Sequence, residues 1–428
     1  MGELRVRGAR RAALRGAGAL VLAAGAARAV GSAVRGLRPG AGVPPVDGAA
    51  WAAFATGAAL ESPPLGAVLA PAAGGLLVCR VRSGRTAPGD ALAAAVGGIG
   101  LAAVTCRWWP LRRDEPADTA RPNVPVPTLR AGKGLIAVVN CDAGGDAPAD
   151  AELRDLLPEA ELRLCDSDDD LRAVLRRAAG DALAGGGALG TVGGDGTVNT
   201  AAVIAADVGV PLAVFPGGTL NHFAADLGLR TLQDTAAAVE AGHGGAIDLG
   251  RVTADGTSGR TPVTYFLNTF SIGVYPELVR AREAREARLG KWPALGVGLV
   301  RVLTGATPTE VTVDGRRRRL WLLFAGNSRY DPPGFAPTYR RSLDDGLLDI
   351  RTVDGGHPFA RTRLVAAFLT GTLATSRVYE ARTAARVRIE GMGAGEDYSR
   401  DGEVSPGDGT LVVDKRPCAV TVYLPAPS

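Results

Sequence analysis

The stretch Gly190–Asn199, with the sequence GTVGGDGTVN, lies between the apolar pair Ala188-Leu189 and an alanine-rich run over residues 200–206. This order predicts a strand, a tight glycine turn and a helix. Glycine lets the backbone of such a turn approach an anion, and the N-terminus of the helix adds a positive dipole. Asp195 is the exception in the turn, because a carboxylate repels a phosphate unless a cation or a proton transfer involves it. The stretch therefore indicates Mg²⁺-nucleotide chemistry.

The composition excludes several classes of function. The chain has 428 residues, which is enough for two or three domains. The formal net charge is only +4, so we expect no nucleic-acid partner. The five cysteines include no Cys-x-x-Cys pair, which argues against structural zinc and against a disulfide framework. Reduced thiols in a protein that faces the cytosol are the simplest interpretation.

Residues 1–110 differ from the rest of the chain in composition. Three of their stretches are apolar and uncharged: Ala17–Ala27, Pro63–Cys79 and Ala91–Cys106. Each is somewhat shorter than the roughly 20 residues that a membrane helix needs. We favour a helical, membrane-associated region, and a soluble alanine-rich helical domain is the alternative. Residues 111–132 are charged and then proline-rich, and we expect them to form a linker.

The pattern of strand, glycine turn and helix occurs three times in the next part of the chain. Leu135–Val139 leads into the glycine turn that begins at Asn140, the turn quoted above follows, and Pro211–Phe215 precedes Pro216–Asn221, with the sequence PGGTLN. Such repeats are typical of a parallel sheet whose ligand loops lie at the carboxyl ends of the strands.

Strand-like runs dominate from residue 251 onward, among them Thr264–Ile272, Leu411–Val413 and Ala419–Leu424. A helix is expected over residues 275–289, and Asp314-Gly315 is a hairpin signal. The predicted fold class is therefore α/β. We expect a Rossmann-like, parallel-sheet nucleotide-binding lobe over residues 133–250, a β-rich, sandwich-like lobe over residues 251–428, and the helical N-terminal region before them.

Two motifs together carry a resemblance to a known family. Gly193–Asn199 (GGDGTVN) and Pro216–Asn221 (PGGTLN) resemble the diacylglycerol kinase catalytic domain family, which includes bacterial lipid kinases and sphingosine kinases. The resemblance covers roughly residues 133–425. NAD kinases and phosphofructokinases carry a turn like the first motif, whereas the second motif separates lipid kinases from them. The resemblance implies transfer of the γ-phosphate of ATP, with Mg²⁺, to a lipid hydroxyl such as that of diacylglycerol.

Later segments agree with this resemblance. Phe266–Gly273 looks like the family's core strand, Ser342–Asp349 like a signature of its β-rich lobe, and Asp401–Glu403 like its late acidic motif. The first glycine turn departs from the family's pattern, because Cys141 replaces a proline and Ala143 replaces a serine.

The resemblance implies that one group of residues holds the nucleotide. Its members are Asn140, Gly193, Gly194, Gly196, Thr197, Asn199, Gly217, Gly218 and Thr219. The glycines would let the backbone approach the ATP phosphates. The two threonine hydroxyls would bond phosphate oxygens, although simple caps of the following helices would look the same.

Three acidic residues are the predicted catalytic groups. Glu403 is the general base that takes the proton from the lipid hydroxyl as it attacks the γ-phosphate. Asp401 would orient Glu403 or hold Mg²⁺ through water; a solvated acidic loop is the alternative for both. Asp195 would act through Mg²⁺ or the phosphate pocket, and the alternative is a capping aspartate.

Metal ligands are also implied. Asp248 would join the catalytic Mg²⁺ water network, and Asp345 with the carbonyl oxygen of Leu347 resembles the family's structural Mg²⁺ site. Oxygen ligands of this kind suit a hard cation, whereas a turn aspartate is the alternative for Asp345.

The N-terminal region resembles a second family. Trp51–Glu61 and Cys79–Asp90 look like the second half of a type-2 phosphatidic acid phosphatase domain, in which Cys79 stands for the motif's serine and Thr86 for its nucleophilic histidine. Only Arg80 and Asp90 match. The resemblance implies a degenerate remnant that serves as an anchor or scaffold and cannot form a phosphohistidine.

The first hypothesis is thus an ATP- and Mg²⁺-dependent lipid kinase at the cell membrane, with its kinase domain facing the cytoplasm. Its partners would be the lipid substrate and the bilayer, and a homodimer is left open. A soluble-metabolite kinase of the NAD kinase or phosphofructokinase type is one alternative. A non-catalytic, membrane-bound pseudo-kinase that binds nucleotide or lipid is the other.

Overall fold

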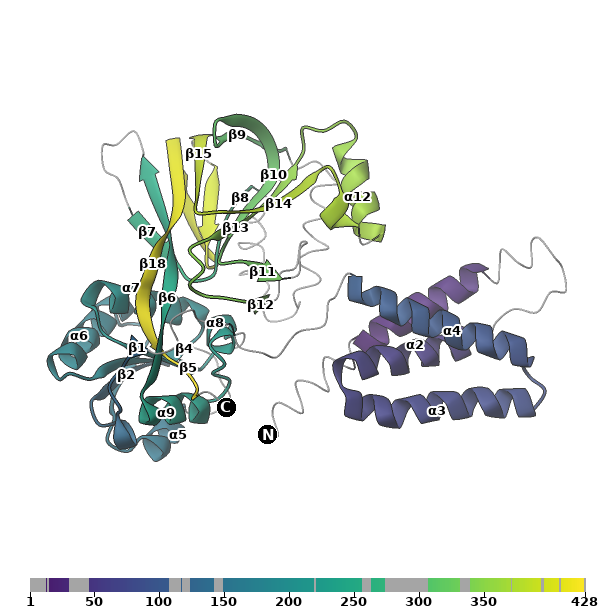
Figure 1. Cartoon of the computed structure of the whole chain (residues 1–428), viewed down its shortest axis with the longest axis horizontal. Helices are drawn as coiled ribbons and strands as arrows, with labels where there is room; N and C mark the ends of the chain where they lie inside the picture. The colour runs from purple at the N-terminus through teal and green to yellow at the C-terminus, as the bar shows by residue number, and fades with distance from the viewer. Residues whose placement is uncertain are drawn as a thin grey trace. The chain divides into compact units, whose positions relative to one another are not determined.

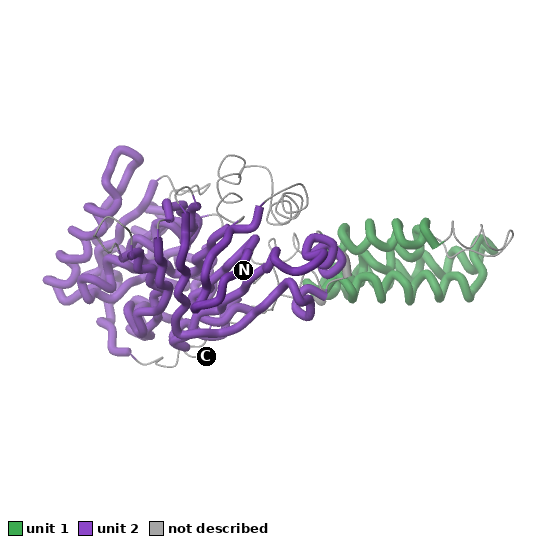
Figure 2. Tube along the Cα trace, turned by 90° about the horizontal axis from the view of Figure 1, so that it is seen from above, with its two compact units in different colours: residues 1–113 green, residues 114–428 purple. Residues whose placement is uncertain are grey.

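The structure is a computed structural model of the whole chain. It describes residues 13, 15–30, 46–107, 117, 124–141, 149–218, 221–255, 263–273, 307–331, 339–370, 372–393, 396–407 and 409–426. The chain divides into two compact units, Met1–Arg113 and Asp114–Ser428 (Figure 2).

The helices of the first unit pack through small residues. They are a helix over residues 15–30, α2 (Val46–Glu61), α3 (Pro63–Arg82), α4 (Pro88–Val104) and the short η1 (Thr105–Arg107). A methyl group added at Gly98 of α4 would lie 2.3 Å from the carbonyl oxygen of Ala49 in α2, so these two helices approach closely. Arg15 is 1% exposed and pairs with Glu61 at 2.7 Å, which joins the first helix to α2.

Large apolar side chains of this unit point outward instead of inward. Val68, Leu92 and Val96 are 62–69% exposed, whereas Ala53 and Ala102 are fully buried. Small residues between helices and large apolar residues outside them suit a lipid environment better than water. The part of α3 over Pro64–Arg82 is long and apolar enough to cross a membrane, and α4 is apolar but shorter. The unit therefore favours membrane association, while the resemblance to a phosphatase remains a prediction.

The second unit begins with an α/β lobe. Its elements in chain order are β1 (Val124–Pro125), η2 (Arg130–Gly132), β2 (Leu135–Asn140), α5 (Ala149–Leu156), β3 (Glu161–Cys165), α6 (Leu171–Ala184), β4 (Ala188–Gly193), α7 (Asp195–Val208), β5 (Leu212–Pro216), α8 (His222–Asp226), α9 (Leu232–Ala241) and β6 (His243–Asp255). Strands β5, β4, β2 and β3 lie side by side in this order and are parallel. Apolar residues fill β2 and β4 almost completely, because helices cover both faces of the sheet (Figure 1).

The connections explain where the ligand loops lie. Helix α5 connects β2 to β3, whereas α6 and α7 lead back across the sheet to β4 and β5. Because such crossovers are right-handed, α5 lies on one face of the sheet and α6 and α7 lie on the other. All these strands end at the same edge. Asn140, Gly193 and Pro216 are their last residues, so the three predicted turns start side by side.

A β-rich lobe follows in the same unit. Its elements are β7 (Val263–Phe266), β8 (Thr269–Gly273), β9 (Thr309–Val313), β10 (Arg316–Asn327), β11 (Tyr330–Asp331), β12 (Tyr339–Arg340), β13 (Leu348–Asp354), α12 (Ala360–Thr370), η3 (Leu373–Thr375), β14 (Tyr379–Ala384), β15 (Arg386–Met392), β16 (Asp397–Arg400), β17 (Glu403–Pro406) and β18 (Gly409–Tyr423). Its strands are antiparallel and have their own buried core, which includes Phe266, Phe270 and Ile350.

Two long strands join the lobes. β18 pairs with β15 of the β-rich lobe and with β5 of the α/β lobe, and β6 runs antiparallel to it (Figure 1). Most of the described strands of the second unit thereby form one sheet. The predicted fold class is confirmed. The predicted boundary at residue 250 falls inside β6, which spans His243–Asp255. The predicted limits of the two lobes remain predictions.

The strands of the β-rich lobe differ from the sequence expectation in two places. The run Thr264–Ile272 is not one strand, because the chain turns at Leu267-Asn268 between β7 and β8. The runs Leu411–Val413 and Ala419–Leu424 instead belong to the single strand β18, which has an irregularity between residues 416 and 420. The helix expected over residues 275–289 lies outside the described residues.

Candidate active site

The two glycine turns touch each other at the edge of the parallel sheet. The N–H of Gly217 donates to the carbonyl oxygen of Gly193 at 3.2 Å. A methyl group at Gly218 would lie 2.5 Å from the Cα of Gly194, and one at Gly217 would lie 3.0 Å from the backbone nitrogen of Gly193. Contacts this short between backbones exclude any side chain. The glycines at 217 and 218 are therefore required by the packing of one turn on the other.

Gly196 has a different environment from its neighbours. A methyl group at Gly193 would meet the side chain of Thr197 at 2.8 Å, whereas one at Gly196 would meet no atom within 4 Å. Gly196 is exposed in the first turn of α7, whose N-cap, Gly194, offers no capping side chain. N–H groups at such a helix start attract anions. The open space there gives a phosphate room to approach the backbone.

Polar side chains from β2 and from α7 itself support this helix start. Asn140, the last residue of β2, donates from Nδ2 to Oγ1 of Thr197 at 2.8 Å. Thr197 is 6% exposed, so its hydroxyl lies beneath the surface of the turn. Asn199, in the next part of α7, is also buried, and its Oδ1 has no hydrogen-bond partner among the described residues. The structure thus brings Asn140, Thr197 and Asn199 to the two turns.

Asp195 contacts the segment that follows the second turn. Its Oδ1 accepts a hydrogen bond from the N–H of Phe223, in the first turn of α8, at 3.3 Å. A carboxylate at a helix start stabilises that helix, so Asp195 caps α8 in this structure. A role toward Mg²⁺ or phosphate stays a prediction.

Asn221 was not singled out from the sequence, yet it shapes the second turn. Its backbone has a φ of 49°, and its Oδ1 accepts from the N–H of Gly218 at 2.9 Å while its Nδ2 donates to the carbonyl oxygen of the same residue at 2.6 Å. Asparagine tolerates this left-handed conformation better than most residues, which is the signal that would have identified it. Thr219 lies outside the described residues.

Asp401 holds the turn between β7 and β8. One oxygen accepts from the N–H of Leu267 at 2.6 Å, and the other accepts from the N–H groups of Asn268 and Thr269, both at 2.8 Å. Burial raises the pKa of Asp401 to about 6, although these N–H donors and Arg340 lower it. These bonds explain why the chain breaks between the two strands, and they make Asp401 a positioning residue.

Glu403 lies two residues beyond Asp401, at the start of β17. The hairpin between β16 and β17 turns through Asp401 and Gly402, both with positive φ. The side chain of Glu403 is 52% exposed and pairs with Nη2 of Arg400 at 3.1 Å. An exposed carboxylate on a fixed hairpin can accept a proton from an incoming substrate. A role as the general base stays a prediction.

A buried arginine links the turn between β7 and β8 to the α/β lobe. Arg340 is 1% exposed, and its guanidinium pairs with Asp226 of α8 at 2.7 Å. It also donates to the carbonyl oxygen of Leu267 at 2.7 Å and to Oδ1 of Asn268 at 3.0 Å. No local pattern marked Arg340, because Asp226, Leu267 and Asn268 are distant from it in the chain.

The ring of Tyr330 lies beside this arginine, 5.4 Å from its guanidinium carbon. Burial is the main reason that the pKa of Tyr330 is raised, and the charges of Asp401 and Asp195 raise it further. The Tyr330 hydroxyl therefore lies within electrostatic reach of both carboxylates.

The three predicted metal ligands also lie together, but around an ammonium group. Nζ of Lys415 lies 2.8 Å from Oδ2 of Asp248, 3.0 Å from Oδ1 of Asp345 and 3.2 Å from the carbonyl oxygen of Leu347. The pKa of Asp345 is lowered, since Lys415 and backbone N–H donors outweigh the effect of burial. These residues do not fit a resident Mg²⁺, because Lys415 occupies the space between them. In the described part of the chain, no group of three His, Cys, Asp or Glu residues could hold a metal.

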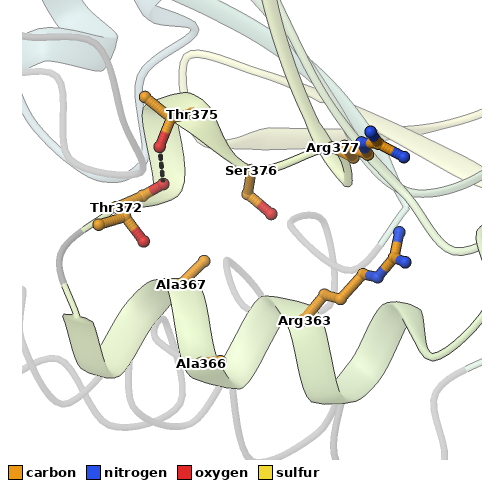
Figure 3. Close-up of a pocket in the computed structure, with 7 residues that line it drawn as sticks. All are labelled: Arg363, Ala366, Ala367, Thr372, Thr375, Ser376 and Arg377. Atoms are coloured by element: carbon orange, nitrogen blue, oxygen red, sulfur yellow. Dashed lines mark hydrogen bonds between the residues drawn. The ribbon is translucent and has the colours of Figure 1, made fainter.

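A separate cavity of about 340 Å³ lies beside α12, and none of the predicted site residues lines it. Figure 3 shows Arg363 projecting from α12, with Ser376 and Arg377 in the segment after η3. Its lining residues are Arg363, Ala366, Ala367, Thr372, Thr375, Ser376 and Arg377. It lacks the glycine turns and is not the predicted nucleotide site.

Comparison with known proteins agrees with this geometry. Residues 135–252 match the family model described as the diacylglycerol kinase catalytic domain. Two curated relatives named diacylglycerol kinase, from two strains of Mycobacterium tuberculosis, are each 30% identical over 192 residues, which covers 43% of this chain. The matched part spans 59% of the length of these relatives.

The fold also matches a solved structure. A crystal structure from Bacillus anthracis strain Sterne, whose title reads "a putative diacylglycerol kinase", superimposes with a TM-score of 0.50 at 22% identity. It covers 68% of this chain and 97% of that chain. The family model and the curated relatives confirm the predicted resemblance to the diacylglycerol kinase catalytic domain family, and the solved structure agrees in fold.

Proposed function

We propose that the chain transfers the γ-phosphate of ATP to the hydroxyl of a membrane lipid, with diacylglycerol as the first candidate. The observation that carries the proposal is the pair of glycine turns packed on each other beside the open start of α7. The name of the curated relatives supports the choice of lipid. The apolar outer face of the first unit supports a location at the cell membrane, with the kinase unit on the cytoplasmic side.

The chain's own residues suggest how the reaction proceeds. The N–H groups near Gly194 and Gly196 bind the phosphates of ATP, and the bond from Asn140 to Thr197 holds the start of α7 in place for them. Mg²⁺ bound to ATP supplies charge neutralisation, and Asp195 lies at the turn that would receive it.

Glu403 accepts the proton of the lipid hydroxyl while its oxygen forms the bond to the γ-phosphorus. The bond from this phosphorus to the bridging oxygen of ADP breaks, and ADP leaves. Asp401 keeps the hairpin that carries Glu403 in place.

The substrate is tested by incubating the protein with ATP, Mg²⁺ and vesicles that contain diacylglycerol, a sphingoid base, ceramide, phosphatidylglycerol and a polyprenol. Mass spectrometry would show which molecule gains a phosphate, and we expect phosphatidic acid. Phosphorylation of added NAD alone would favour the soluble-metabolite kinase. ATP binding without any transfer would favour the pseudo-kinase.

Two glycine substitutions separate packing from phosphate binding. We expect Gly218→Ala to lower the melting temperature, because the new methyl group would overlap the backbone of Gly194 and overpacking typically costs about 1–3 kcal/mol. Gly196→Ala should leave the melting temperature unchanged or raise it, since alanine favours a helix more than glycine does. Its methyl group should nevertheless weaken ATP binding, measured by calorimetry.

Each variant is compared with the wild type. Equal ATP affinity of Gly196→Ala and the wild type would show that the phosphates do not approach the start of α7.

A further inference from the structure

Four oxygen atoms surround the ammonium group of Lys415. Besides Asp248, Asp345 and the carbonyl oxygen of Leu347, Oγ of Ser328 lies 2.9 Å from Nζ. An ammonium group has three hydrogen-bond donors, so all three can be used and the charge is shared among four acceptors. The side chain of Lys415 is 2% exposed. Four oxygen atoms around one positive charge resemble the ligands of a bound cation, but here the charge belongs to a side chain. We call these four oxygen atoms the cage.

The acidic members of the cage are fixed in place independently of Lys415. Asp248 is 1% exposed, and its Oδ2 accepts from the N–H of Gly346 at 2.9 Å and its Oδ1 from the N–H of Cys418 at 2.8 Å. Asp345 accepts from the N–H of Leu347 at 2.9 Å. Two preformed carboxylates this close to each other need a positive charge, because like charges in a buried site repel strongly.

The cage lies where the strands that join the two lobes meet the loops of the β-rich lobe. Asp248 belongs to β6 and Lys415 to β18, whereas Asp345 and Leu347 precede β13. Asn327 continues the connection, because its Nδ2 donates to the carbonyl oxygens of Asp248 and Leu267 at 2.8 and 2.9 Å. A cation at this place therefore joins β6 and β18 to the loop before β13.

We infer that the ammonium group of Lys415 takes the place of a structural metal ion at this junction, so that the chain is held together there by a tethered cation. The inference concerns folding stability and does not depend on the proposed kinase activity. It also leaves untouched any Mg²⁺ that arrives with ATP.

The test measures thermal unfolding of the full chain without nucleotide, in EDTA and then with millimolar MgCl₂ or CaCl₂ at matched ionic strength. The wild type should unfold at the same temperature in all three buffers. Lys415→Ala should unfold at a clearly lower temperature in EDTA, because two carboxylates then lack their counter-charge. Mg²⁺ or Ca²⁺ should restore part of that loss, since the substitution opens a space lined by oxygen atoms.

Lys133→Ala is the matched control, because Lys133 is an exposed lysine in the same unit. It should behave like the wild type in every buffer. The inference would be overturned by a wild type that loses stability in EDTA, or by a Lys415→Ala variant as stable as Lys133→Ala. It would also be overturned if neither divalent cation stabilised Lys415→Ala more than the control. If Lys415→Ala does not fold, the wild-type comparison decides, with Asp345→Asn as a milder variant that should lower the melting temperature without introducing dependence on a divalent cation.

Discussion

Replacing Glu403 with glutamine should lower the rate of phosphate transfer by about 10²–10⁴-fold, because a positioned general base contributes this much to a reaction of this type. Glutamine keeps the size of the side chain and can still contact Arg400, but it cannot take a proton. Glu403 is half-exposed and makes one ion pair, so the melting temperature should change little. The measurement is kcat with saturating ATP and lipid, together with the melting temperature of both proteins.

The matched control is Glu390→Gln. Glu390 belongs to the same lobe, is similarly exposed and pairs with an arginine, Arg388, at 2.7 Å. The Glu390→Gln variant should retain the wild-type rate of phosphate transfer. Similar rates for Glu403→Gln and Glu390→Gln would exclude Glu403 as the base.

Replacing Arg340 with methionine should destabilise the protein by about 3–5 kcal/mol, the usual cost of leaving one charge of a buried pair without its partner. Asp226 would lose its partner, and the carbonyl oxygen of Leu267 and the amide oxygen of Asn268 would lose a donor. The pKa of Arg340 is raised, since Tyr330 and its acidic neighbours outweigh the effect of burial. Urea denaturation would measure the loss.

The neighbouring Arg341 provides the control for this experiment. Its side chain is 66% exposed and pairs with Asp331, so Arg341→Met should have a much smaller effect. The double variant Arg340→Met with Asp226→Leu should recover part of the stability, because it removes both buried charges. A single variant at Arg340 as stable as the one at Arg341 would contradict this account of the network.

Local sequence signals were sufficient to predict the parallel strands of the α/β lobe and the place of its ligand loops. Glycine turns after short apolar runs predicted β2, β4 and β5 and the edge at which their loops meet, because each signal spans only about ten residues. The adjacency of Gly193 and Gly217 followed from the rule that neighbouring parallel strands end together.

The β-rich lobe was less predictable, because its important contacts join distant segments. Lys415 meets Asp248 across 167 positions of sequence (415 − 248), and no motif marks it as a partner. Asp401 likewise divides β7 from β8 through backbone N–H groups, which every residue but proline has. A strand-like composition over residues 264–272 could not show that a carboxylate 130 residues later would break it.

Helix α2 shows a different reason for an incomplete prediction. Val46–Glu61 is rich in alanine and glycine, with no polar face opposite an apolar one. Its residues meet other helices of similar composition, so no periodic pattern distinguishes inner from outer positions.

The central claim is that this chain moves phosphate from ATP to a lipid hydroxyl. The direct measurement gives the protein ATP labelled in its γ-phosphate, Mg²⁺, diacylglycerol vesicles and NAD in one reaction, followed by separation of the organic and aqueous phases. The account predicts label in phosphatidic acid in the organic phase with the wild type, and almost none with Glu403→Gln. Label confined to water-soluble products, or equal lipid labelling by both proteins, would contradict it.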